Sequence, residues 1–163
     1  MLKPIKRIVT GHTDEGRATF IIDEEIETTV IPTGDAAMAT IWSTAKVPAD
    51  CNDNIDGRLL EVGTTLKGGS VIRVVDMLPG ASSPMHRTSS IDYGIVMKGA
   101  IELELENGEI KTIEEGGIIV QRGTIHRWRN PNQNEKCRIV FVLTEAKPFE
   151  VNGKPLPDEM IHE

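Results

Sequence analysis

The chain has 163 residues, of which 39% are hydrophobic and 26% charged, a composition typical of one folded domain rather than a disordered chain. Its net charge of −7 argues against nucleic acid or an anionic membrane as a partner, and no apolar run approaches the ~18 residues that span a bilayer. No secretory signal follows Met1, and Cys51 and Cys137 are far apart without metal-like spacing. We therefore expect a cytoplasmic protein without disulfides, in which both cysteines are small buried or half-buried residues.

Short apolar runs bounded by Gly, Pro, Asn or Asp recur along the chain, whereas helical periodicity is weak throughout. The runs are rich in β-branched Ile, Val and Thr, which favours strands and predicts an all-β sandwich or barrel. In chain order the predicted strands are Ala18 to Ile22, Ala39 to Ser43, Val71 to Met77, Tyr93 to Met97, Ile118 to Gln121, His126 to Arg129 and Arg138 to Leu143.

The clearest predicted hairpin runs from Ala100 to Ile113. Ile101, Leu103 and Leu105 alternate with glutamates, the pattern of a half-buried strand with one wet face. Asn107-Gly108 follows and is suited to a type I′ turn, in which both central residues have positive φ. The return strand is expected from about Glu109.

The predicted organisation is a single domain, 1–163, with a core barrel at about 68–146. Residues 1–67 supply N-terminal strands and loops, forming a loop-rich lobe, and residues 147–163 form a C-terminal arm. This arm is expected to be extended or to end in a short helix around Asp158 to His162. The runs 93–97 and 139–143 have almost no polar side, so each should be covered on both faces. In a chain this short the second cover can be another subunit, and we expect a homodimer.

Two stretches have the spacing of functional motifs. In the first, Gly80, His86, Asp92 and Gly99 match the pattern Gly, five residues, His-x-His, three or four residues, Glu, six residues, Gly. In the second, Gly123, His126 and Asn130 match the end of the pattern Gly, five residues, Pro-x-Gly, two residues, His, three residues, Asn. The chain thus resembles the cupin superfamily from about Val71 to Leu143, and more closely its small single-domain bacterial and fungal members of the cupin 2 conserved-barrel type. This resemblance implies a double-stranded β-helix, or jelly roll.

The resemblance also implies a metal site, from which this sequence departs. The family ligand set is three His and one Glu. Thr88 stands where the second His is usual and Asp92 where Glu is usual, so the set is reduced to His86, Asp92 and His126. In addition, Gln121 replaces the usual Pro, and the distance back to Gly116 is one residue short.

Two chemistries are open to His86, Asp92 and His126. Two imidazoles and one carboxylate are a ligand set for one divalent transition metal, Fe(II), Mn(II), Zn or Ni. Without a metal, a histidine that titrates near neutral pH, with Asp92 beside it, can act as a general base next to a carbonyl group. Both possibilities predict that the three residues converge in one pocket and are the catalytic residues.

Four further residues are candidates for substrate binding. Arg73 lies in the apolar run Val71 to Val75, and if it points inward it can clamp a carboxylate or phenolate. Thr88, Gln121 and Trp128 are the others, with Trp128 suited to wall a planar substrate. Tyr93 has the opposite parity to Asp92 and is expected outside the barrel, as are Arg127 and Arg129.

The functional prediction is a small-molecule enzyme with lyase or isomerase chemistry. Its substrate would be an oxygenated organic acid or enolisable ketone that is decarboxylated, dehydrated or isomerised. The alternatives are an Fe(II) cupin dioxygenase, a non-catalytic ligand-binding cupin, and a structural interaction domain in which the histidines are relics, since fold alone does not determine function.

Overall fold

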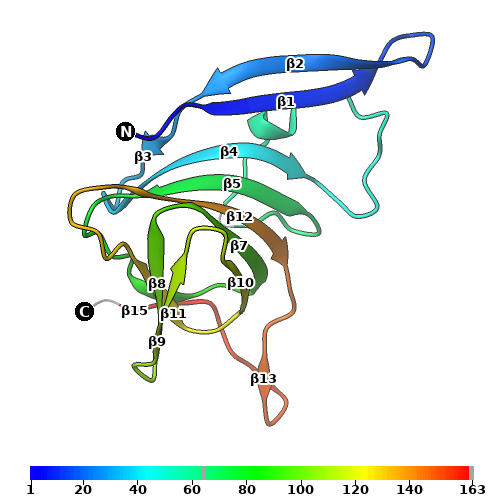
Figure 1. Cartoon of the computed structure of the whole chain (residues 1–163). Coiled ribbons are helices and arrows are strands. Elements are labelled where there is room, and N and C mark those ends of the chain that lie inside the picture. Colours follow the sequence, from blue (N-terminus) through cyan, green and yellow to red (C-terminus); the bar gives the residue numbers. More distant parts are fainter. Residues whose placement is uncertain (64, 162–163) are drawn as a thin grey trace.

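The computed structural model describes residues 1–63 and 65–161, and it is built almost entirely of strands (Figure 1). The strands are β1 (Ile5–His12), β2 (Ala18–Ile26), β3 (Thr29–Val30), β4 (Ala36–Thr44), β5 (Ser70–Met77), β6 (Met85–Arg87), β7 (Ser90–Lys98), β8 (Ala100–Leu105), β9 (Ile110–Glu114), β10 (Ile118–Arg122), β11 (His126–Arg129), β12 (Cys137–Glu145), β13 (Glu150–Val151), β14 (Lys154–Pro155) and β15 (Glu159–Ile161). One short 3₁₀ turn, η1 (Gly57–Leu59), interrupts the long connection between β4 and β5. In the described part of the chain, no helix has the length and apolar character needed to cross a membrane.

Two sheets form the barrel and confirm the predicted jelly roll. A six-stranded sheet has the order β10-β7-β12-β5-β4-β3, and a five-stranded sheet has the order β15-β6-β11-β8-β9. The pairing within both is antiparallel, so side chains alternate between the barrel interior and its outer face.

The core fills the space between the sheets with aliphatic and aromatic side chains. Val96, Ile139 and Phe141 come from the six-stranded sheet, and Ile101 and Trp128 from the five-stranded sheet. Ile101 and Ile139 are fully buried. Burial of such side chains contributes about 1.5–3 kcal/mol each, which is why the alternating apolar pattern determines which face of each strand points inward.

The N-terminal part is more regular than expected. β1 and β2 pair into a hairpin that lies across the outer side of β4 and β5, with its turn pointing away from the barrel (Figure 1). Arg7, 2% exposed, anchors it: its guanidinium donates to the Ile41 carbonyl and pairs with Glu24 and Asp56. Among the described residues of this N-terminal part, the longest irregular stretch is the connection between β4 and β5.

Both sheets extend beyond the expected core barrel of 68–146. β3 and β4 join the six-stranded sheet, and β15 joins the five-stranded sheet by pairing with β6. Of the two alternatives for the C-terminal arm, the extended form is confirmed for residues 147–161. The short helix is wrong for residues 159–161, whose backbone hydrogen bonds go to β6; His162 lies outside the described residues. β15 is too short to show a period-2 pattern, so its sequence carried little strand signal.

The hairpin of β8 and β9 has a different turn from the predicted one. Gly108 has φ 83°, but Asn107 is absent from the residues with positive φ, so the type I′ turn is wrong. The Gly108 amide instead donates to the Leu105 carbonyl, and the Leu105 amide to the Glu109 carbonyl. This is a tight turn followed by a left-handed glycine, the arrangement of three-residue hairpin loops.

Candidate functional site

A partly open cavity of about 130 Å³ lies between the two sheets and is lined by both polar and apolar side chains. Its polar lining residues are Asp35, Arg73, Ser83, His86, Thr88, Asp92 and His126. The apolar lining includes Met38, Val75, Trp128, Phe141 and Leu143. A space of this kind, mostly apolar with a few convergent polar groups, is typical of a small-molecule site.

Two histidines face each other at this cavity. His86 is the central residue of β6 and His126 is the first residue of β11, and the two are directly paired across the antiparallel strands. Their ring centroids are 4.5 Å apart, with an interplanar angle of 48°. His126 is fully buried, whereas His86 is half-buried.

The same local hydrogen bond orients both imidazoles. Nδ1 of His86 lies 2.8 Å from the Pro84 carbonyl oxygen, and Nδ1 of His126 lies 2.8 Å from the Thr124 carbonyl oxygen. A carbonyl oxygen only accepts hydrogen bonds, so we assign the ring proton to Nδ1 in each neutral imidazole. Nε2 of each ring therefore carries the lone pair that can accept a proton or bind a cation.

Burial keeps His126 neutral. Burial, and to a lesser extent the neighbouring His86, lowers the pKa of His126 to about 4. His126 is therefore uncharged at neutral pH and is a weak proton acceptor there.

Asp92 reaches the cavity from β7, and Gln121 of β10 orients it. Gln121 Nε2 donates to Asp92 Oδ2 at 3.1 Å, while Gln121 Oε1 accepts from the Thr124 backbone amide at 2.9 Å. Asp92 Oδ1 is buried and has no hydrogen-bond partner in the structure. Burial raises the pKa of the Asp92 carboxyl above its usual value. Leaving a buried acceptor without a hydrogen bond costs folding free energy. Such an atom is therefore a good candidate for contact with a ligand, which would supply the missing hydrogen bond.

Arg73 points inward from β5, as the sequence suggested. It lines the cavity, and its guanidinium donates to the Gly63 carbonyl of the β4–β5 connection. Burial lowers the pKa of this guanidinium, which nevertheless stays charged because arginine does not deprotonate in proteins. The lining of the cavity thus combines the positive charge of Arg73 with the histidine and aspartate side chains.

Aromatic rings form the apolar wall. The rings of Trp128 and His126 are nearly perpendicular, at a centroid distance of 5.4 Å, and the Trp128 ring is 5.2 Å from that of Phe141. Gly94 makes room for Phe141, because a Cβ at this position would lie 2.9 Å from the phenylalanine Cε1. The wall gives a planar substrate a surface to stack on.

The three expected metal ligands line one cavity but do not form a ligand cluster. In residues 1–63 and 65–161, no group of three or more His, Cys, Asp or Glu side chains is arranged to hold a metal ion. Thr88, at the position of the usual second histidine, also lines the cavity. The residues present therefore do not fit the metal centre that the family resemblance implies: two imidazoles and the Asp92 carboxylate line the cavity, but they are not grouped as a set of metal ligands.

The structure brings together six of the seven predicted site residues and adds two. His86, Asp92, His126, Arg73, Thr88 and Trp128 line the cavity, and Gln121 contacts it only through Asp92. Asp35 and Ser83 also line it and were not predicted. Their only sequence signal is position: Asp35 follows the turn before β4, and Ser83 lies three residues before His86.

The residues expected outside the barrel lie there. Tyr93 is 47% exposed, and Arg127 and Arg129 pair with Glu104 and Glu102 of the neighbouring strand.

The two cysteines differ in burial. Cys137 is buried as expected, but Cys51 is exposed, which corrects that prediction; it lies in a turn of the irregular β4–β5 connection.

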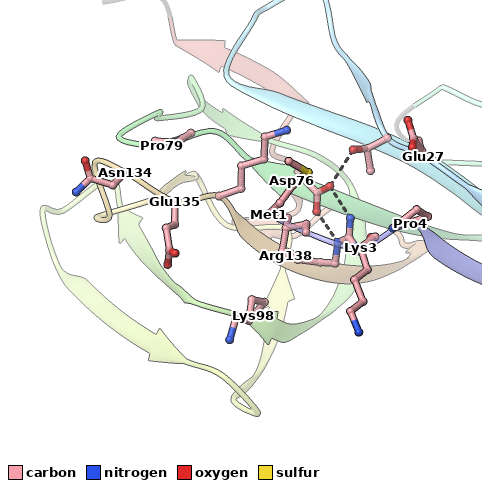
Figure 2. Close-up of a pocket in the computed structure, with 13 residues that line it drawn as sticks. Met1, Lys3, Pro4, Glu27, Asp76, Pro79, Lys98, Asn134, Glu135 and Arg138 are labelled. Atoms are coloured by element: carbon pink, nitrogen blue, oxygen red, sulfur yellow. Dashed lines mark hydrogen bonds and ion pairs between the residues drawn. The ribbon is translucent and has the colours of Figure 1, made fainter.

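A larger cavity of about 550 Å³ lies outside the barrel, between the N-terminal residues and the ends of β5 and β12 (Figure 2). Asp76, 2% exposed, accepts from Arg138 Nε and Nη2 at 2.7 and 2.8 Å and from the Thr28 hydroxyl at 2.8 Å. Arg138 also donates to the Lys3 carbonyl at 2.7 Å. These contacts satisfy the buried charges and hold the N-terminus in place, so the polar groups here have a structural role.

Comparison with known proteins identifies a family match and similar fungal proteins. The family described as Cupin domain matches residues 73–143. "Phomopsin biosynthesis cluster protein C'" of Diaporthe leptostromiformis is 40% identical over 95% of this chain and 86% of its own length. "Cupin-domain-containing oxidoreductase fogC" of Aspergillus ruber is 37% identical over 95% of this chain and 79% of its own.

Solved structures agree with the fold. The polyketide cyclase RemF from Streptomyces resistomycificus has a TM-score of 0.53, with 15% identity, over 100% of this chain and 87% of its own. An ethanolamine utilization protein Q from Salmonella typhimurium has a TM-score of 0.52, with 10% identity, over 88% of this chain and 98% of its own. At these identities the likeness concerns the fold alone.

Proposed function

The chain belongs to the cupin superfamily, and we propose that it is a small-molecule enzyme that moves protons on an oxygenated organic acid or enolisable ketone. The observation that carries this proposal is the facing pair of His86 and His126. In each ring Nδ1 is held by a carbonyl oxygen, so Nε2 is left as a proton acceptor. Positioned imidazoles in a largely apolar cavity are suited to general acid–base chemistry.

We assign the base to His86. His126, whose pKa is about 4, accepts a proton poorly at neutral pH, and its neutral ring packs against His86. In the proposed step, Nε2 of His86 takes a proton from a carbon next to the substrate carbonyl. The electron pair of that C–H bond moves to the carbonyl oxygen and forms an enolate.

The other polar groups would hold the substrate and the enolate. The Arg73 guanidinium is the charged group suited to a carboxylate or to the enolate oxygen. Asp92 Oδ1, buried without a partner, would accept from a substrate hydroxyl group. Gln121 holds Asp92 in place, and Thr88 and Trp128 complete the walls.

Three outcomes of the enolate fit this arrangement. Return of the proton from His86 to a different carbon isomerises the substrate. Departure of a hydroxyl group from the neighbouring carbon, as water after protonation, dehydrates it. Loss of CO₂ from a β-oxo acid leaves the same enolate from the electrons of the C–C bond, and His86, having taken up a proton from the substrate carboxyl group or from solvent, then donates it to the carbon. All three need a group that carries a proton, an oxyanion partner and a largely apolar cavity.

Two other functions are compatible with the fold. The relative from Aspergillus ruber is named an oxidoreductase, which favours a metal-dependent dioxygenase as the second candidate. A third is a non-catalytic cupin that binds the same ligand without converting it. It predicts saturable binding that survives His126→Ala, with no turnover by the unmodified protein.

The test is hydrogen–deuterium exchange at carbon. Purified protein is incubated in D₂O with a panel of α- and β-oxo acids and cyclic diketones, and deuterium incorporation is followed by NMR. We expect exchange in at least one compound and a loss of about 10²- to 10⁴-fold in His86→Gln. His12→Gln is the control, because His12 is exposed at the end of β1. Equal exchange by the unmodified protein and His86→Gln would refute the proposal.

A further inference from the structure

A groove on the surface of the barrel shares two lining residues with the cavity that holds His86, Asp92 and His126, here called the inner cavity. The groove has a volume of about 430 Å³, and Asp35 and Ser83 line both it and the inner cavity. Its other lining residues are Thr33, Ser82, Pro84, Met85, Arg127 and Ile161. The two spaces are therefore neighbours at the turn before β4 and the segment before β6.

We propose that this junction is the mouth of the barrel and that the groove binds the part of the substrate that the inner cavity cannot hold. The inner cavity has about 130 Å³. An apolar protein cavity of about 150 Å³ is filled by benzene, so this one takes a reacting head of about one ring. The substrate class is then an oxo acid or ketone with a compact head and a longer tail. This inference rests on the proposed function, since it takes the inner cavity as the place of reaction.

The chemistry of the groove indicates an uncharged tail. Thr33, Ser82 and Ser83 offer hydroxyl groups, and Pro84, Met85 and Ile161 offer apolar surface. The guanidinium of Arg127 is paired with Glu104, with Nε and Nη2 at 2.7 and 3.2 Å from its oxygens. With Arg127 paired, the Asp35 carboxylate, which accepts from the Thr33 hydroxyl, disfavours an anionic tail, whereas hydroxyl and aliphatic groups find matching partners.

The C-terminal strand forms one wall of this groove. β15 pairs with β6 in the register Ile161↔Met85 and Met160↔His86. The strand that carries the proposed base is thus held on one side by β11 and on the other by β15. Ile161 and Met85 reach the groove from these two paired strands, so the C-terminal arm shapes the tail site.

The first experiment is calorimetric binding to a series of straight-chain α-oxo acids of four, six, eight and ten carbons. Once the inner cavity is full, each further methylene seated in the groove should raise the affinity up to about fourfold. Thr33→Phe and Ser82→Phe place a ring in the groove from opposite sides and should abolish this gain, while the affinity for the four-carbon acid is retained. Thr112→Phe, exposed on β9, is the control that should keep the gain.

A gain that stops at six carbons in the unmodified protein, or that persists in both groove variants, would overturn the tail site. Failure of the four-carbon acid to bind would count against the substrate class of the proposed function instead. The mouth is then decided by a second readout that needs no substrate.

This second readout is acrylamide quenching of Trp128. The chain has two tryptophans, so Trp42→Phe leaves only Trp128, which lines the inner cavity. Adding both Thr33→Phe and Ser82→Phe to this protein should cause a loss of quenching, whereas adding Thr112→Phe should not. Quenching that is unchanged by the two groove substitutions would overturn the assignment of the mouth.

Discussion

The imidazole rings of His86 and His126 lie opposite each other on paired strands, with their centroids 4.5 Å apart. Two cations at this separation would repel each other, so the pair favours a state with at most one charge. Burial selects His126 as the neutral member, since its pKa is about 4. The two neighbouring histidines thus differ in their surroundings, because His126 is fully buried and His86 is half-buried.

The neutral state of His126 should make stability depend on pH. Its pKa of about 4 in the folded protein lies below the value of 6.5 in the unfolded chain. The unfolded chain thus binds the proton first as the pH falls, and stability is lost between about pH 6.5 and 4. Over this range the free energy of unfolding should fall by about 3 kcal/mol. The free energy of unfolding is measured by urea titration from pH 7 to 4 for the unmodified protein and for His126→Gln, and we expect the variant to lack this loss. The same dependence of the free energy of unfolding on pH in both proteins would contradict the assignment.

Asp92→Asn should stabilise the fold and reduce activity. Burial raises the pKa of Asp92, so the fold disfavours its carboxylate, and stability falls as the pH rises through the raised pKa. Asparagine does not titrate and still offers an oxygen to Gln121. At pH 7 the midpoint of urea unfolding should therefore rise, while exchange at carbon falls by about 10²-fold if Asp92 positions the substrate. A lower midpoint would show that the carboxylate is stabilised in the fold.

Gly94→Ala should damage the aromatic wall. The added Cβ would lie 2.9 Å from Phe141 Cε1, and Phe141 lines the inner cavity. Overpacking of this kind costs about 1–3 kcal/mol. Thermal unfolding should reveal that loss in Gly94→Ala, and Phe141→Leu in the same chain should recover part of it. No recovery in the double variant would mean that the strain lies elsewhere.

The expected homodimer stays a prediction, and the structure identifies a face to test. Tyr93 and Met97 of β7 and Ile118 and Val120 of β10 are 47–70% exposed on the outer side of the six-stranded sheet. Val120 is the register partner of Tyr93, so the two strands present adjacent apolar side chains. Light scattering should give the mass of two chains, and Tyr93→Glu with Ile118→Glu should give that of one. A single-chain mass for the unmodified protein would refute the prediction.

Motif spacing and strand parity were enough to predict the inner face of the barrel. Asp92 and Tyr93 are neighbours on β7, and their opposite parity places one in the cavity and the other in solvent. The convergence of His86 and His126 followed from the spacing of two motifs forty residues apart. What spacing could not supply was the distance between side chains, and the ligand cluster of the family does not form.

The strand β1 and the two residues Asp35 and Ser83 were not predicted, for physical reasons. In β1, Arg7 is 2% exposed and its neighbour Ile8 is 52% exposed, so the usual relation of polarity to burial is reversed at these two positions. Arg7 is buried because its charge is paired with Glu24 and Asp56, contacts that no local pattern reveals. Asp35 and Ser83 lie just before β4 and β6, far apart in the sequence, and only the three-dimensional structure shows that they line the same two spaces.

The most direct test of the account is deuterium exchange at carbon before and after removal of metal. Protein dialysed against a chelator, with its metal content verified by elemental analysis, is compared with protein reloaded with Fe(II), Mn(II), Zn or Ni. We predict that the metal-free protein retains its exchange rate and that His86→Gln loses it under both conditions. Exchange that disappears with the metal and returns with one of these ions would contradict a base acting alone and favour the metal-dependent alternative.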